Sequence, residues 1–176
     1  KGSRSVAIGL NSLETQNFTD ATNAYNVSIG ALAGTNITTG IRNILIGGAA
    51  ATNATTPNDS VIIGYDAGGG ATLTGNDNIL IGREAGHDLA GGYSHVFIGR
   101  DAGDKVSGGL GSVIIGASAG GANMASYGVV VGYEAAAVST VSTTAIGYRA
   151  SKASTVSVAN TAIGNNTLAT NVGAQL

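Results

Sequence analysis

Four stretches of the chain repeat one phrase: NVSIGALAG at 26–34, SVIIGYDAG at 60–68, NILIGREAG at 78–86 and HVFIGRDAG at 95–103. The glycine after the aliphatic residues recurs at intervals of 15 to 21 residues, most often 17. A fixed period predicts a stacked array, in which each unit buries its apolar side against its neighbours. We therefore expect one repeat domain over residues 1–176. The recurring glycines are Gly9, Gly30, Gly47, Gly64, Gly82, Gly99, Gly116, Gly132, Gly147 and Gly164.

Each repeat begins with the pattern of a strand. The residue before the glycine is isoleucine in nine repeats and Val131 in the tenth, and two residues earlier stands Val, Ile or, in the last two repeats, Thr. Residues that are β-branched at every second position predict a strand. We expect the glycine to end it, because the corner requires a positive φ or a close backbone approach.

The remainder of each repeat predicts a tight corner, a short second strand and a polar return loop. Alanine stands three residues after the glycine in eight repeats. At roughly 4.8 Å per coil, ten coils would form a rod of roughly 48 Å. The predicted fold class is all-β, a parallel β-roll or solenoid of about ten short coils. The weaker apolar positions that suggest the second strand are Ile37, Leu73, Leu89, Val106 and Val156.

The middle residue of each strand predicts self-association. In a lone solenoid we expect this residue to point to water, yet it is apolar in the central repeats, and a strand that is apolar on both faces packs against something else. We expect the partner to be the same chain, in a parallel homotrimer, although a covering element elsewhere in a longer protein is the alternative. The predicted interface residues are Leu45, Ile62, Leu80, Phe97, Ile114 and Val130.

The composition excludes several classes of protein. The chain has 29 Gly, no Trp, two Phe and 10% charged residues, but 43% hydrophobic residues, so an ordinary large core and a disordered chain are both disfavoured. The formal net charge of −2 gives no attraction for nucleic acid. There is no apolar run long enough for membrane insertion, and no Cys for a disulfide or thiolate site. Because the chain begins at Lys1 without a visible signal peptide, we expect a segment of a longer fibrous protein, joined to other fibre, tail or anchor segments.

The repeats resemble those of two groups of fibrous proteins. SVAIG at 5–9, STTAIGYRASKAS at 142–154 and NTAIG at 160–164 are similar to the head repeats of trimeric autotransporter adhesins. The fuller pattern in ITTGIRNILIG at 37–47 and LTGNDNILIG at 73–82 resembles repeats of bacteriophage tail fibres and tail spikes. The resemblance implies a left-handed parallel β-roll in an intertwined or side-by-side homotrimer.

The resemblance also implies a function. It suggests a structural and adhesive fibre segment of a phage tail fibre or spike, located in the virion tail, that displays or contacts a host-surface glycan or protein. The alternative is the head of an adhesin on a bacterial cell surface. A third class, the glycan-cleaving spike, is disfavoured because the chain has no Trp to stack sugars and each coil is too short for a groove. We expect no enzymatic activity, no catalytic residues and no cofactor.

The two positions after the glycine form ladders along the predicted rod, and these are the candidate sites. We expect a cation–π contact between Tyr65 and Arg83, and diagonal ion pairs from Arg83 to Asp101 and from Arg100 to Glu84. A solvated or inter-chain belt of salt bridges is the competing interpretation. The predicted ligand-binding residues are Tyr65, Arg83, Arg100, Tyr133 and Tyr148.

Three further features are weighed. Glu84 and Asp101 on adjacent coils have the spacing of a retaining glycosidase pair, but they lack a cleft. His87 and His95 are considered as metal ligands, and surface loop residues are the favoured interpretation. The first interval of 21 residues predicts a longer loop at 10–26, for binding or for capping the end of the stack.

Overall fold

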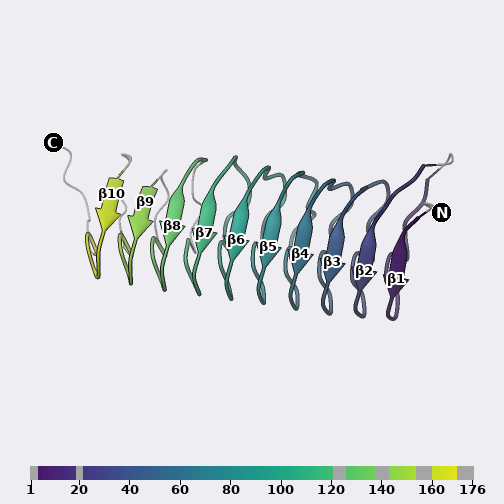
Figure 1. Cartoon of the computed structure of the whole chain (residues 1–176), viewed down its shortest axis with the longest axis horizontal. Helices are drawn as coiled ribbons and strands as arrows, with labels where there is room; N and C mark the ends of the chain where they lie inside the picture. Colours follow the sequence, from purple (N-terminus) through teal and green to yellow (C-terminus); the bar gives the residue numbers. More distant parts are fainter. Residues whose placement is uncertain (1–3, 19–21, 121–125, 138–142, 154–159, 170–176) are drawn as a thin grey trace.

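The computed structural model describes residues 4–18, 22–120, 126–137, 143–153 and 160–169. Within them the chain forms ten strands in one parallel sheet, stacked in sequence order. Figure 1 shows a rod with β1 and β10 at opposite ends. This confirms the all-β solenoid. The strands are β1 (Val6–Ile8), β2 (Val27–Ile29), β3 (Ile44–Ile46), β4 (Val61–Ile63), β5 (Ile79–Ile81), β6 (Val96–Ile98), β7 (Val113–Ile115), β8 (Val129–Val131), β9 (Thr143–Ile146) and β10 (Asn160–Ile163).

The register places equivalent residues of successive repeats beside one another. Val96 pairs with Val113, Phe97 with Ile114 and Ile98 with Ile115, and the other strands pair in the same way, whatever the length of the loop between them. Each repeat is therefore one coil, and each side-chain position becomes a row along the rod.

The corner glycines have the predicted conformation. Gly99 has φ 133°, and a Cβ atom built on it would lie 2.7 Å from the carbonyl carbon and oxygen of Gly116 in the next coil. All ten corner glycines have φ between 124° and 138°. A side chain would therefore be strained at this corner and, where another coil follows, would collide with its backbone.

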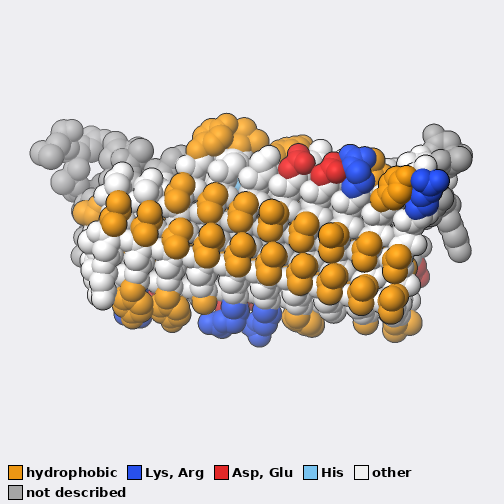
Figure 2. Space-filling model, viewed as in Figure 1, with side chains coloured by type: hydrophobic (Ala, Val, Ile, Leu, Met, Phe, Trp, Pro, Cys, Tyr) orange, Lys and Arg blue, Asp and Glu red, His pale blue; other side chains and the backbone are white. Residues whose placement is uncertain are grey.

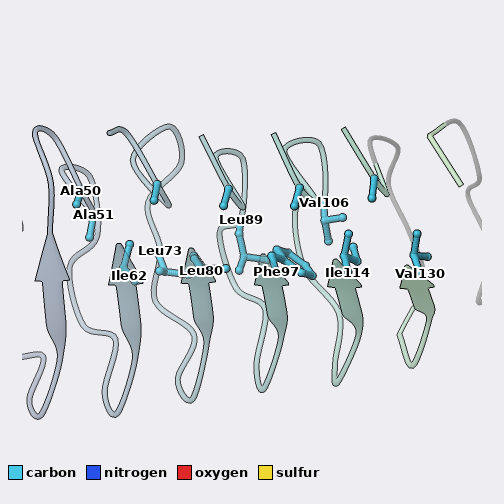
Figure 3. Packing of buried hydrophobic residues seen from close by; sticks show 14 of the residues in the cluster. Ala50, Ala51, Ile62, Leu73, Leu80, Leu89, Phe97, Val106, Ile114 and Val130 are labelled. Atoms are coloured by element: carbon cyan, nitrogen blue, oxygen red, sulfur yellow. The ribbon is translucent and has the colours of Figure 1, made fainter. Parts of the chain in front are cut away.

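The core lies inside the coils. The middle residues of β3 to β9 are buried in one cluster with corner alanines, three residues after the glycine, and with apolar residues of the described return segments, as Figure 3 shows for Leu80, Leu89 and Phe97. The corner alanines from Ala33 to Ala150 are buried in all eight coils that carry them. Ile37, Leu73, Leu89 and Val106 are buried as expected, and Val156 lies outside the described residues.

The expected second strand is absent from the described part of the chain. The segments after the corner are turns, although they too are joined between coils by backbone hydrogen bonds, for example from Gly86 N–H to the Ala102 carbonyl at 2.9 Å. An isolated parallel bridge outside the named strands joins Tyr93 to Leu110. Each coil thus has one short strand, and turns, bends and irregular segments make up the rest of its described residues.

A buried polar ladder precedes the strands. The N–H of Asn43 donates to Oδ1 of Asn26 at 2.9 Å, and the N–H of Ser60 donates to Oδ1 of Asn43 at 3.0 Å. The amide Nδ2 of Asn43 donates to the Pro57 carbonyl at 2.7 Å. Each asparagine thus satisfies backbone groups that a core would otherwise leave unpaired. The ladder comprises Asn26, Asn43, Ser60, Asn78, His95 and Ser112, all buried.

The first part of the loop predicted at 10–26 is hydrogen-bonded to the next coil. The N–H groups of Leu13, Thr15 and Asn17 donate to carbonyl groups of the second coil at 3.0–3.1 Å, so residues 10–17 follow the normal coil path. The Arg42 N–H donates to the Ala24 carbonyl at 2.7 Å, which restores the register before β2. The rest of the predicted loop includes residues 19–21, which lie outside the described residues.

Candidate interaction surfaces

The outer face of the sheet carries two rows of aliphatic side chains. They come from the first and third residues of each three-residue strand, such as Val96 and Ile98 in β6, and Figure 2 shows both rows running along the rod. Ile29, Ile44, Ile115 and Val129 are 36–39% exposed even though coils stack on both sides of them. We call this surface the apolar face. A continuous apolar strip of this kind marks an association site.

The prediction that the middle strand residues point to water in a single chain is wrong. Leu45, Ile62, Leu80, Phe97, Ile114 and Val130 are each 0% exposed, because they fill the interior of their own coils. The sequence correctly indicated strands that are apolar on both sides, but it assigned the two sides the wrong way round. These six residues are therefore unavailable to a second copy, and the flanking rows take their place on the surface.

The five predicted ligand-binding residues lie in one row. Each follows a corner glycine, and each is exposed: Tyr65 by 62%, Tyr133 by 44% and Tyr148 by 43%, with the Arg83 and Arg100 side chains at 55% and 56%. We call this row, which borders the apolar face where the strands end, the downstream edge. Its members are Leu10, Ala31, Gly48, Tyr65, Arg83, Arg100, Ala117, Tyr133, Tyr148 and Asn165.

The structure joins two of these residues directly. The rings of Tyr133 and Tyr148 stack with centroids 5.7 Å apart and an interplanar angle of 10°, and the Arg149 guanidinium lies 4.9 Å from the Tyr148 centroid. Tyr65 lies four coils away from Tyr133, over Gly48. In the described residues the cation–π contacts are Arg149 over Tyr148 and Arg4 over Tyr25, so the expected contact between Tyr65 and Arg83 does not form.

The arginines pair with their sequence neighbours. Arg83 Nη2 lies 3.2 Å from Oε1 of Glu84, and Arg100 Nη1 lies 3.3 Å from Oδ2 of Asp101. The expected diagonal pairs between coils are therefore wrong. These pairs also place a cation against each of the two carboxylates that were weighed as a glycosidase pair.

A tighter ionic cluster surrounds Glu134. Its Oε2 accepts hydrogen bonds from Nζ of Lys152 and from Nε of Arg149, the latter at 2.9 Å. These bonds, with Lys152 first, lower the pKa of Glu134 to about 2. Sequence analysis missed this cluster, although Glu134, Arg149 and Lys152 come from adjacent coils and the period alone places them together.

The two histidines occupy separate environments. His87 Nδ1 lies 2.7 Å from Asp88 Oδ1, and Lys105 Nζ lies 3.2 Å from the other oxygen of Asp88, at the surface. His95 is 1% exposed and stacks on Phe97 with centroids 4.9 Å apart. The pair therefore does not form one metal site, and the described residues contain no group of three or more His, Cys, Asp or Glu side chains arranged for a metal ion.

His95 stands in the polar ladder where other coils have asparagine. Its Nδ1 accepts the N–H of Ser112 at 3.1 Å, and its buried Nε2 has no hydrogen-bond partner. Burial lowers the pKa of His95 below its usual 6.5, and the backbone groups of Gly108 and Gly109 offset only part of that effect. The neutral ring is therefore the form that the fold accommodates.

The described part of the chain has no helix of the length and hydropathy needed to cross a membrane. Comparison with protein-family models, with curated proteins and with solved structures finds no match to this chain.

Proposed function

We propose that this chain is a rigid, non-enzymatic segment of a trimeric fibre, in which three parallel copies pack through their apolar faces. The observation that carries the proposal is the pair of aliphatic rows, half-buried or exposed, of which one runs from β1 to β8 and the other from β1 to β10. Burying such a strip contributes about 25 cal/mol for each Å² of apolar area removed from water. The left-handed coil and the trimer follow the resemblance described above.

The direction of the hydrogen bonds supports a role in rigid display. Backbone bonds between coils run along the rod in the sheet and also in the turns, as from Gly103 N–H to the Ala119 carbonyl at 2.9 Å. Bending the rod would stretch several such bonds in every coil at once. A segment of this kind would hold whatever adjoins it at a fixed distance from its point of attachment.

For its location we propose a bacteriophage tail fibre or spike that reaches the host surface, and the I-G-x-x-A-G and T-G-x-x-N patterns support this choice. The head of a bacterial trimeric autotransporter adhesin is the second candidate, supported by SVAIG at 5–9 and NTAIG at 160–164. The neighbouring genes separate the two: tail and fibre-assembly genes in one case, and a C-terminal membrane anchor in the same reading frame in the other.

Association is tested by measuring mass in solution. We expect sedimentation equilibrium to give three times the chain mass of 17.1 kDa. Val96→Lys combined with Ile98→Lys should give a folded monomer, because both side chains lie on the outer face of β6. Thr39→Lys, at an exposed position of a return segment, is the control and should remain trimeric. A wild-type chain that stays monomeric at high concentration would contradict the proposal.

Direct recognition is tested at the downstream edge. We propose that host glycan or protein contacts use Tyr65, Arg83, Arg100, Tyr133 and Tyr148, where flat rings and guanidinium groups repeat along the rod and weak contacts add through multivalency. Binding of the trimer to host cells should fall when all five are alanine. Equal binding of the wild-type and five-alanine proteins would show that these residues do not contact the host, and the segment would then be a structural shaft. Cleavage of host polysaccharide would overturn the non-enzymatic proposal.

A further inference from the structure

The apolar face is bordered on its other side by a second row of side chains, which we call the upstream edge. Its described members stand two residues before strands β1 to β8 and share φ values of 52–65°, so the backbone has the same local conformation at each of them. Because a strand separates the two edges, they lie on opposite sides of the apolar face, and Figure 2 shows charged side chains along both borders. The upstream edge comprises Arg4, Tyr25, Arg42, Asp59, Asp77, Ser94, Gly111 and Tyr127.

The two edges carry opposite charge in the middle of the rod. On the upstream edge, Asp59 is already paired with Arg42 through Oδ1 to Nε at 2.5 Å and Oδ2 to Nη2 at 2.6 Å. Asp77, in the next coil, is exposed and attracts Arg42 only at longer range. On the downstream edge, Arg83 and Arg100 present their guanidinium groups outside the less exposed carboxylates of Glu84 and Asp101.

Symmetry determines which edges meet when apolar faces come together. A rotation axis parallel to the rods, whether twofold or threefold, keeps the copies parallel and brings the upstream edge of one against the downstream edge of the next. A twofold axis perpendicular to the rods makes them antiparallel and brings like edges together. The charge on the edges therefore distinguishes the two arrangements.

In a parallel arrangement with coils at equal height, Asp77 faces Arg83 beside β5. At the same heights Asp59 faces Tyr65 beside β4, and Tyr127 faces Tyr133 beside β8. The match includes an ion pair and an aromatic pair and creates no contact between like charges. Charge complementarity of this kind sets orientation and register more than it adds affinity.

In the antiparallel arrangement with full overlap of ten strands, the twofold axis passes between β5 and β6. Arg83 of one copy then lies opposite Arg100 of the other, and Asp77 lies opposite Ser94. Like charges at close range disfavour this arrangement.

The size of the apolar face shows why the edges belong to the interface. Three extended residues span about 10 Å and ten coils about 48 Å, so the face projects about 480 Å² per copy. Two such faces give about 1,000 Å², the lower limit for a specific interface. The edges supply the additional contact area.

We infer that the partner on the apolar face is a second copy in parallel, with Asp77 of each chain against Arg83 of the next. This inference rests on the proposed association of the chain with itself. It adds the register and the pair of residues that selects it, and it assigns Arg83 to the contact between copies and not to the host surface.

Disulfide trapping tests the arrangement without background, because the chain has no cysteine. Two differently tagged chains, one with Asp77→Cys and one with Arg83→Cys, are mixed, assembled and oxidised. We expect a heterodisulfide between the tags and no disulfide in either chain alone, because the two positions of one chain lie on opposite edges. The matched control mixes Arg83→Cys with Arg100→Cys, which approach each other only in the antiparallel arrangement.

The outcomes separate this inference from the proposed function. An assembly of the expected mass that gives no disulfide between positions 77 and 83, or that gives one between positions 83 and 100, overturns the parallel pairing and leaves self-association intact. If the wild-type chain stays monomeric, both this inference and the proposed self-association are wrong.

Charge reversal tests the pair itself. Asp77→Arg places two cations together and should weaken trimer association by about twofold to fivefold for each interface. Asp77→Arg combined with Arg83→Asp should restore it at low salt. Equal association of all three proteins, with unchanged circular dichroism, would show that Asp77 and Arg83 do not meet.

Discussion

The ring of Phe97 fills the space that a side chain on Gly103 would need: a Cβ atom built on Gly103 would lie 2.7 Å from Cδ2 of the ring. The two residues belong to one coil and are six positions apart. The same complementary choice of residue size recurs along the rod. A large middle strand residue generally has glycine six positions later, and the small middle residues at the two ends have leucine there. The pairs are Ile62 with Gly68, Leu80 with Gly86, Ile114 with Gly120, Ala7 with Leu13 and Ala162 with Leu168.

Gly103→Ala should lower the free energy of unfolding by about 2–4 kcal/mol, because the added methyl group meets Phe97 and φ is 61°. The midpoint of urea unfolding measures the loss. Gly91→Ala is the matched control, since a Cβ atom there meets nothing within 4 Å. An equal shift in both variants would contradict the packing argument.

Gly99→Ala tests the corner between coils. The new Cβ atom would lie 2.7 Å from backbone atoms of Gly116, which cannot move aside as a side chain can. We expect a loss of about 2–4 kcal/mol, measured in the same way. Gly108→Ala serves as the control because its surroundings are open, and an unchanged melting temperature for Gly99→Ala would show that the corner tolerates a side chain.

His95 should make the stability of the chain depend on pH. Its pKa is lowered in the folded state, so the unfolded state binds the proton more tightly. The stability that neutral His95 contributes is therefore fully present above about pH 6.5, and it is lost as the pH falls below that value towards the pKa of the folded state. Protonating Nδ1 would also set two donors, the ring and the Ser112 N–H, against each other.

The measurement is the unfolding midpoint between pH 8 and pH 5, with His95→Asn as the control. Asparagine occupies the same position in four other coils, so this variant should fold, and it should lose the part of the pH dependence of stability that His95 contributes. A slope that is the same in the variant would assign the pH dependence to another group.

Glu134 should stay ionised in acid. Its hydrogen bonds to Lys152 and Arg149 lower its pKa from 4.5 to about 2, so the stability it contributes is present above about 4.5 and is lost as the pH falls towards 2. Carbon-detected NMR titration of the side-chain carboxyl groups measures this directly. Lys152→Met should move the pKa of Glu134 back towards 4.5, and a normal value in the wild-type chain would mean that the cluster does not form in solution.

Adjacent residues of β6 should separate folding from assembly. Phe97→Asp buries a charge inside the coil and should unfold the chain. Ile98→Asp places its charge on the outer face, so the chain should keep its circular dichroism and lose association. If Phe97→Asp folded normally and only failed to assemble, the inward orientation of the middle row would be wrong.

The fold was predictable because a repeat amplifies weak signals. One three-residue strand is too short to identify, but ten copies with glycine at a constant place identify the strand and its corner. The buried asparagine ladder also had a signal, since Asn or Ser precedes most strands, yet the pattern alone does not show that these side chains bond across coils.

The orientation of the strands was not predictable from alternation. A strand that is apolar on both faces gives no contrast between inside and outside. The information lay instead in pairs six residues apart: Phe97 with Gly103 and Ile114 with Gly120 show that the middle residue competes for interior volume. The salt bridges were missed for another reason, because flexible side chains such as Arg83 choose between a neighbour in sequence and a neighbour in the next coil.

Each corner glycine that has a following coil lies close to the backbone of the next corner glycine, at nearly the same distance along the rod. The coils are therefore interchangeable. Removing residues 79–95 would join Asn78 to Val96 and recreate the phrase N-V-F-I-G, with an asparagine again in the ladder. Every remaining coil would find the same kind of neighbour that it has now. The length of the rod can therefore change in steps of one coil, about 4.8 Å each, while its cross-section and the two edges of the apolar face stay the same.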